Sequence, residues 1–182
     1  MPATITRYTT TAITLHWLMA LLIVATFSLG VTMTDIPGVT PTKLKYFNWH
    51  KWLGVTVLGF ATVRAVWRLT HAAPSLPTSV PVWQRHISAL THGLLYLLIF
   101  AVPISGYLYS LASGFKVVYL GVLPLPVVMD ASPALKPILL AVHYWLNVSL
   151  LVLVLLHVAA ALKHHFWERD TVLLRMLPWR KS

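Results

Sequence analysis

Four long apolar stretches dominate the sequence, at about residues 12–33, 47–69, 86–112 and 138–162. Each approaches or exceeds the roughly 20 apolar residues that a helix needs to cross a bilayer. Because lipid offers no hydrogen-bonding partner, backbone groups in such segments must bond internally, which favours helices over open strands. With 58% hydrophobic and only 10% charged residues, the chain is predicted to be an all-α transmembrane four-helix bundle that forms one domain over residues 1–182.

The second stretch is the least apolar of the four, because its uncharged part runs only from Trp52 to Val63, between Lys51 and Arg64. It spans a bilayer only if these charges reach the interface or face the bundle interior. The first stretch is longer than a signal-peptide core and no A-x-A-like site follows it, so we expect a retained helix. Linkers rich in Pro and small residues separate the stretches, at residues 34–43, 71–81 and 120–137.

The basic residues predict how the bundle is oriented. Four helices place both termini on one side, and that side carries nine basic residues: Arg7, Arg64, Arg68, Arg85, Lys163, Arg169, Arg175, Arg180 and Lys181. The other side carries five: Lys43, Lys45, Lys51, Lys116 and Lys136. Since the cytoplasmic side of membrane proteins is enriched in Lys and Arg, both termini are expected in the cytoplasm. Because the basic residues lie mainly at helix ends, membrane lipid rather than nucleic acid is the expected partner.

The chain has nine histidines and no cysteine. The absence of cysteine excludes structural disulfides, thiolate-bound iron–sulfur clusters, thiolate-bound haem and covalent haem attachment through C-x-x-C-H. Any metal in this protein therefore depends on histidine, carboxylate or methionine.

Four of the histidines are expected to form two pairs, each at one depth in the membrane. His143 and His157 are fourteen residues apart on the fourth helix, which is about 21 Å of rise and about 40° short of four full turns. Both rings therefore project from nearly one face, one in each leaflet. His50 lies near the outer end of the second helix and shares the depth of His143, whereas His16 lies near the inner end of the first and shares the depth of His157.

Two histidines from facing helices at one depth suit a haem inserted in a bundle, with one imidazole on each side of the iron. The sequence thus predicts two haem b groups, with His16 and His157 as iron ligands on one and His50 and His143 on the other. A histidine in a membrane helix also bonds a neighbouring helix or lines a wet cavity, which is the structural alternative. Zinc fits less well, because neither depth shows a third or fourth ligand.

Arg64 and His92 are two further candidates at the inner depth. Arg64 follows His50 by fourteen residues, so it is expected to face the interior and pair with haem propionates, unless it extends to the inner interface. A weak internal repeat aligns residues 16–30 with residues 92–106, and "HKWLGV" with "HYWLNV". If the repeat is real, His92 corresponds to His16 and Arg64 to His157. His92 is then a rival inner ligand, a residue for quinone binding or proton transfer, or a plain interhelical hydrogen-bonding group.

Six segments together resemble the bacterial cytochrome b561 family. They are "TLHWL" (14–18), "NWHKWLG" (48–54) with "VRAVWRL" (63–69), "LTHGLLYLLIFAVPISGY" (90–107), "SGFKVVYLG" (113–121) and "LLHVAAALKHHFWERDTVLLRMLP" (155–178). The last is the most specific, and linker 120–137 is the least similar to the family.

The resemblance implies a four-helix dihaem b-type cytochrome of the bacterial inner membrane, with the same two ligand pairs. It also implies superoxide oxidation coupled to reduction of ubiquinone. On this hypothesis Lys51 and Lys116 at the outer face steer superoxide, and His92 serves the quinone near the inner haem. Two alternatives remain. One is an electron-transfer subunit for a hydrogenase or dehydrogenase partner, which the basic tail from Arg175 would dock. The other is a transporter or scaffold without haem.

Overall fold

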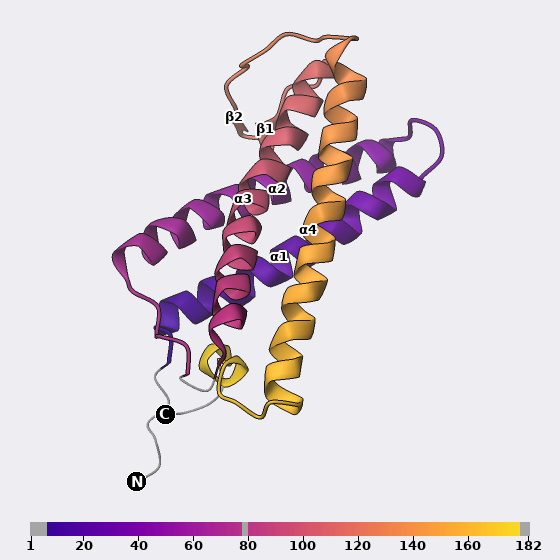
Figure 1. Ribbon diagram of the computed structural model, residues 1–182. Coiled ribbons are helices and arrows are strands. Elements are labelled where there is room, and N and C mark those ends of the chain that lie inside the picture. Colours follow the sequence, from indigo (N-terminus) through magenta and orange to yellow (C-terminus); the bar gives the residue numbers. More distant parts are fainter. Residues whose placement is uncertain (1–6, 78–79, 179–182) are drawn as a thin grey trace.

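The computed structural model describes residues 7–77 and 80–178. Its four long helices are α1 (Thr10–Asp35), α2 (Pro41–Thr70), α3 (Val82–Ala112) and α4 (Leu135–Phe166) (Figure 1). A small hairpin of β1 (Val118–Tyr119) and β2 (Leu123–Pro124) follows α3, and a 3₁₀ turn, η1 (Leu173–Met176), follows α4. All four long helices are long and apolar enough to cross a membrane, which confirms the predicted fold class.

Each helix extends beyond its predicted apolar stretch. The difference at the start of a helix is largest for α2, which begins at Pro41 rather than near residue 47. Thr40 caps this helix, since its Oγ1 accepts a hydrogen bond from the backbone N–H of Lys43 at 3.1 Å, and Pro41 is favoured in the first turn. Hydropathy locates the apolar part of a membrane helix but not the polar turns that cap it.

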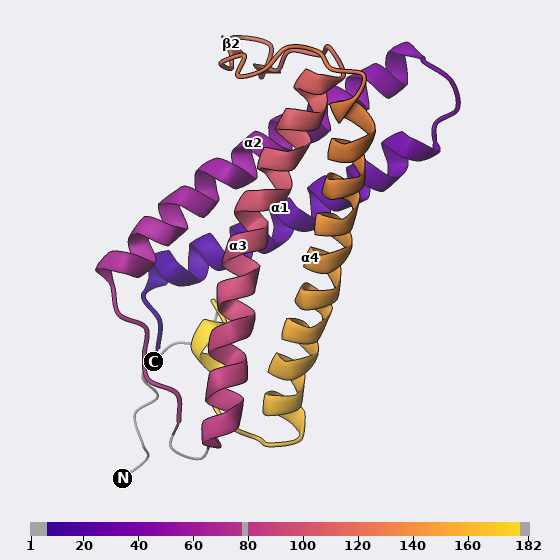
Figure 2. The same ribbon diagram turned by 45° about the horizontal axis from the view of Figure 1, so that its top comes forward.

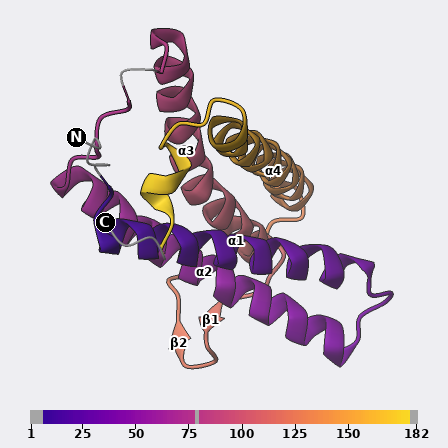
Figure 3. The same cartoon turned by 90° about the horizontal axis from the view of Figure 1, so that it is seen from below.

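The helices pack as two hairpins that cross. α1 packs on α2, α3 packs on α4, and α2 joins the hairpins by packing on α3. Figure 3 shows α1 and α2 side by side and α3 and α4 running across them. α1 and α4 are not a closely packed pair among the described residues, so these two helices can hold side chains or a ligand between them.

The packed core lies midway along the bundle. Every helix contributes to it through Met19, Ala61, Leu98, Ile99 and Leu150. Leu150 stands halfway between His143 and His157 in the sequence of α4, so this apolar layer separates two histidine-bearing levels. Apolar residues outside the core face outward, as expected for helices in lipid.

Both ends of the described chain lie at one end of the bundle, which we call the inner end. The guanidinium of Arg7 donates to the carbonyl of Leu177, and the indole Nε1 of Trp17 donates to the carbonyl of Met176 at 2.7 Å. Figure 2 shows the β1–β2 hairpin at the opposite, outer end. This common position of the two ends is what an even number of spans requires.

The outer loop is held against α2. The indole Nε1 of Trp52 donates to the carbonyl of Val118 at 2.7 Å, and the hydroxyls of Thr56 and Tyr119 are 2.9 Å apart. Residues 120–122 connect the two strands, and Leu120 and Gly121 in this turn both have positive φ, 52° and 74°. The loop is therefore fixed over the outer half of α2.

Candidate metal sites in the bundle

The outer level of the bundle brings His50 of α2 and His143 of α4 together. Their ring centroids are 6.4 Å apart and their planes are inclined by 89°. Both rings are half-buried. The two helices are not consecutive in the chain, so this pairing depends on the crossing of the hairpins.

Each of these two rings lies against a main-chain carbonyl and a glycine of a neighbouring helix, an arrangement that we call a cradle. The Nδ1 of His50 is 3.0 Å from the carbonyl of Thr26, and the Nδ1 of His143 is 3.1 Å from the carbonyl of Val102. Gly30 lies four residues after Thr26 on α1, and Gly106 lies four residues after Val102 on α3. A Cβ at Gly30 would lie 3.0 Å from Cε1 of His50, and a Cβ at Gly106 would lie 2.8 Å from Cε1 of His143. Only glycine lets these rings approach their helices so closely.

The cradles fix the tautomer of both rings. A carbonyl accepts only, so Nδ1 must carry the proton, and Nε2 keeps its lone pair. Ser105 supports one of these bonds, since its Oγ donates to the Val102 carbonyl at 2.8 Å and lies 3.0 Å from the Nδ1 of His143. A histidine whose Nδ1–H is held by a carbonyl is prepared to bind a metal through Nε2.

The inner level gathers three histidines, from α1, α3 and α4. The ring centroids of His16 and His157 are 6.2 Å apart, with planes inclined by 66°. His92 lies nearer to His157, at 5.3 Å between centroids and 73° between planes. His16 and His157 are half-buried, whereas His92 is exposed at the surface of α3.

Arg64 faces the interior at this level, as expected from its spacing after His50. Its Nη1 donates to the Nδ1 of His16 at 3.0 Å, and its Nε donates to the hydroxyl of Tyr96 at 3.2 Å. The guanidinium carbon also lies 5.7 Å from the centre of the Tyr96 ring. Arg68, one turn further along, is exposed, so the two arginines of α2 have different surroundings.

The ring separations allow a test of whether a metal fits between the pairs. Two imidazoles on opposite sides of one metal have their nitrogens about 2 Å from it and their ring centres about 1.1 Å behind, so the centres are about 6.2 Å apart. The His16–His157 and His50–His143 separations, 6.2 Å and 6.4 Å, match this value. The His92–His157 separation, 5.3 Å, is too short for it.

The number of donors indicates what kind of metal group fits. At neither level do the described residues supply a cluster of three or more histidine and carboxylate ligands drawn together on one ion. Two opposed imidazoles in an apolar bundle suit a group that brings its own equatorial ligands, as a porphyrin does.

The two hairpins are built from equivalent contacts, as the internal repeat suggests. His50 rests on Gly30 in the first hairpin, and His143 rests on Gly106 in the second. The counterpart of the His16–Arg64 contact is the His92–His157 contact. The repeated framework therefore presents two equivalent histidines at the outer level, while Arg64 replaces a histidine at the inner level.

A cluster that sequence reasoning missed lies where the chain leaves α4. The Nδ1 of His164 is 2.6 Å from an oxygen of Glu168 and 2.6 Å from an oxygen of Asp170. Lys163 donates to the other Glu168 oxygen at 2.6 Å, and the backbone N–H of Val172 donates to Asp170 at 2.9 Å. The hydrogen bond from Lys163 lowers the pKa of Glu168. These contacts tie the C-terminal segment to α4.

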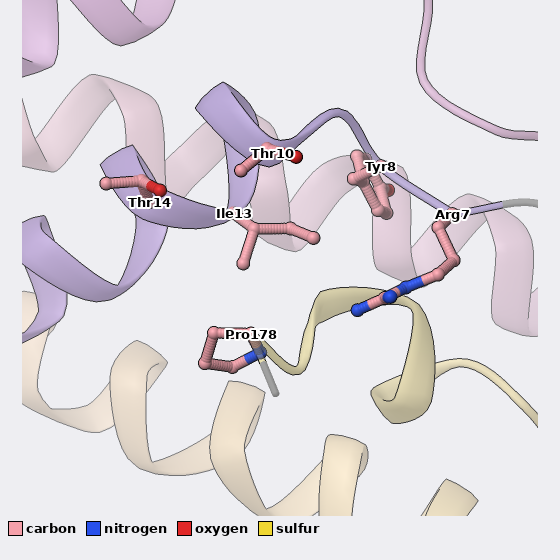
Figure 4. Close-up of a pocket in the computed structure, with 6 residues that line it drawn as sticks. All are labelled: Arg7, Tyr8, Thr10, Ile13, Thr14 and Pro178. Atoms are coloured by element: carbon pink, nitrogen blue, oxygen red, sulfur yellow. The ribbon is translucent and has the colours of Figure 1, made fainter. Parts of the chain in front are cut away.

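The two candidate lysines lie at the outer end. Lys51 is half-buried on α2 and Lys116 is exposed in the loop after α3. The Trp52–Val118 hydrogen bond joins the segments that carry them. A hollow at the inner end, with a volume of about 270 Å³, contains none of the histidines. Figure 4 shows the residues that line it: Arg7, Tyr8, Thr10, Ile13, Thr14 and Pro178.

Comparison with known proteins places this arrangement in a family. The chain is 34% identical over 172 residues to cytochrome b561 homolog 2 of Escherichia coli (strain K12), covering 94% of this chain and 91% of that protein. It is 30% identical over 176 residues to cytochrome b561 homolog 1 of the same organism, covering 96% and 99%. It is 29% identical over 184 residues to the probable superoxide oxidase CybB of Yersinia pestis, covering 97% and 98%. The sequence profile described as prokaryotic cytochrome b561 matches residues 7–179, and the chain therefore belongs to this family of membrane haem proteins.

Proposed function

We propose that this protein oxidises superoxide at the outer end of the bundle and passes the electrons through two haem b groups to ubiquinone. The observation that carries the proposal is the pair of opposed histidines at each of two levels. His50 and His143 would hold one haem, and His16 and His157 the other. When bound in this way, each haem supplies a one-electron carrier in the apolar interior.

The protein's own residues support a path across the membrane. His143 and His157 lie on one face of α4, and the apolar core around Leu150 separates their levels. This core excludes water and ions between the two sites, so an electron can pass where a charged solute cannot. The carbonyls of α1 and α3 hold Nδ1 of the two outer rings, which leaves Nε2 of each ring available to bind a metal.

The outer end suits an anionic donor that needs no proton transfer. Superoxide becomes dioxygen by losing one electron, and no bond to hydrogen forms or breaks. Lys51 and Lys116 add positive charge on segments joined by the Trp52–Val118 bond, and such charge attracts an anion. A superoxide-oxidising role also agrees with the name of one relative, the probable superoxide oxidase.

The quinone end needs protons as well as electrons. Two superoxide ions deliver two electrons, and the quinone takes up two protons to become a quinol. His92 is exposed beside His157, so its imidazole can exchange protons with a bound quinone or water. We therefore assign the quinone to the inner level, in a bacterial inner membrane with both termini in the cytoplasm.

The decisive experiment measures haem stoichiometry and superoxide-driven reduction in the purified protein. We expect two haem b per chain, reduction by superoxide under anaerobic conditions, and reoxidation by a ubiquinone analogue. Haem that is reducible by dithionite but not by superoxide would contradict the enzymatic role. Lys51→Gln and Lys116→Gln should slow reduction several-fold and weaken its dependence on salt. Unchanged rates in both would exclude the steering role.

The rival function is an electron-transfer subunit that serves a soluble redox partner. A basic tail that begins at Arg175 could dock such a partner. Arg175 itself is buried, and its Nη1 donates to the carbonyl of Ser75 at 2.5 Å. Arg180 and Lys181 lie outside the described residues. Co-purification of a soluble redox subunit with the haem-loaded protein would favour this rival.

A further inference from the structure

The two levels of the bundle differ in the charge that faces their histidines. At the outer level the groups held against the rings are neutral main-chain carbonyls, those of Thr26 and Val102. Lys51 follows His50 in sequence, but among the described residues no hydrogen bond joins its ammonium to either ring. At the inner level the guanidinium of Arg64 is hydrogen-bonded to His16, whose ring centroid lies 6.2 Å from that of His157.

No acidic side chain of the protein offsets Arg64 inside the bundle. The chain has four acidic residues, Asp35, Asp130, Glu168 and Asp170, and all of them stand outside the bundle interior, at or beyond helix ends. Within the part of the chain that the structure describes, the Arg64 charge is met by the hydroxyl and ring of Tyr96. A charge in such an apolar setting acts over longer distances than one at the surface.

This difference acts on any redox group that the histidines hold. A nearby cation stabilises the reduced form, which carries one positive charge fewer. A carbonyl that accepts the ligand's Nδ1–H makes the imidazole more basic and stabilises the oxidised form. Both effects raise the reduction potential of the inner site relative to that of the outer site, so the inner site is the better electron acceptor.

We propose that Arg64 makes the inner level the higher-potential site and so directs electrons from the outer to the inner end. This inference rests on the haem ligation proposed above. One electron leaves each superoxide, which becomes dioxygen. The outer site is reoxidised as the inner site is reduced, and two such electrons reach the quinone with two protons from water.

The position of Arg64 does not depend on its bond to His16. Because Arg64 donates to Nδ1 of His16, that nitrogen holds its lone pair and the proton stands on Nε2. Binding a metal through Nε2 would return the proton to Nδ1 and end this bond. The contact with Tyr96 is independent of His16, so the positive charge stays at the inner level.

The experiment is a redox titration of the haem-loaded protein, followed by visible absorbance with chemical reductants. Arg64→Gln removes the charge, Arg64→Lys keeps it, and Arg68→Gln removes an exposed charge one turn away. We expect Arg64→Gln to shift the electron-sharing equilibrium between the haems at least tenfold toward the outer site, which equals 59 mV for one electron. Arg64→Lys should retain most of the wild-type difference in reduction potential between the two haems. Arg68→Gln should change this difference far less than Arg64→Gln does.

The inner haem is identified in the His50→Ala background, where the outer pair is broken. There Arg64→Gln should lower the potential of the remaining haem. An equal shift of both haems, a shift of the outer haem alone, or no shift would overturn the assignment. If Arg64→Gln does not accumulate, Tyr96→Phe replaces it, with a smaller fall expected at the inner haem and none at the outer. Because chemical reductants are used, this result is independent of whether superoxide is the donor, and a protein without two haems would contradict the ligation itself.

Discussion

The outer and inner levels of the bundle start from the same framework and end with different surroundings. At the outer level both halves of the repeat keep a histidine on a glycine, with its Nδ1 on a carbonyl. At the inner level one half keeps His92 against His157, while the other places Arg64 against His16. The difference shows that two hairpins with equivalent contacts can share one kind of site at one level, while Arg64 in place of a histidine changes the charge at the other.

The largest effect on the difference between the two levels is expected when one histidine ligand is removed at a time. His50→Ala or His143→Ala should abolish the outer haem and leave the inner one, because each pair shares no ligand with the other. His16→Ala or His157→Ala should do the reverse. Haem stoichiometry from absorbance and protein concentration measures the outcome. A variant of the outer pair that still binds two haems would show that the pairing is wrong.

Closing the outer cradles should perturb the outer haem alone. A Cβ at Gly106 would meet His143 at 2.8 Å and a Cβ at Gly30 would meet His50 at 3.0 Å, so the rings must shift. Overpacking of this kind costs about 1–3 kcal/mol, and we expect the larger effect from Gly106→Ala. Electron paramagnetic resonance of the oxidised haems reports ring orientation.

Gly59→Ala is the matched control, because a Cβ there has no atom within 4 Å. It should leave both haem signals unchanged and favour the helix slightly. Equal changes from Gly59→Ala and Gly106→Ala would mean that the cradle does not orient the ring.

A smaller change distinguishes the roles considered for His92. The 5.3 Å separation from His157 is too short for that pair to be opposed ligands, and His16 already faces His157 at 6.2 Å. His92→Ala should therefore retain two haems and slow quinone reduction several-fold. Stopped-flow reoxidation by a quinone analogue separates this step from haem reduction. Loss of the inner haem in His92→Ala, with retention in His157→Ala, would make His92 the ligand instead.

The smallest expected effect concerns the C-terminal contacts at the inner end. Because the hydrogen bond from Lys163 lowers the pKa of Glu168 below its ordinary 4.5, the ionised carboxylate stabilises the docked segment above that pH. This contribution is lost as the pH falls through the lowered value. The protection of residues 167–178 against hydrogen exchange, corrected for the intrinsic pH dependence of exchange, should therefore fall only below about pH 4.5. The pH dependence should weaken in Glu168→Gln, whose exchange at neutral pH should already be faster.

The sequence predicted the elements and levels that depend on one helix at a time. The apolar stretches identified all four helices, and the spacing of fourteen residues placed His143 and His157 on one face of α4 and Arg64 toward the interior. These inferences need only the pitch of a helix and the thickness of a bilayer. The starts of the helices were missed, because capping turns such as Thr40–Pro41 are polar.

Features that depend on which helices touch could not be predicted in the same way. The cradles require that α1 packs on α2 at Gly30 and that α3 packs on α4 at Gly106. The repeat did contain a signal, since both segments end in glycine fourteen residues after their histidine. The His164 cluster depends on a turn at Arg169, with φ of 53°, which residue type does not favour.

The weak contact between α1 and α4 has a consequence for how the protein is assembled. Each proposed haem takes one ligand from the α1–α2 hairpin and one from the α3–α4 hairpin, so each cofactor is also a bridge between halves. α2 packs on α3 without a cofactor, whereas docking across the α1–α4 side depends on what lies between these two helices. Haem supply would then control not only activity but also how firmly the two halves are held on that side.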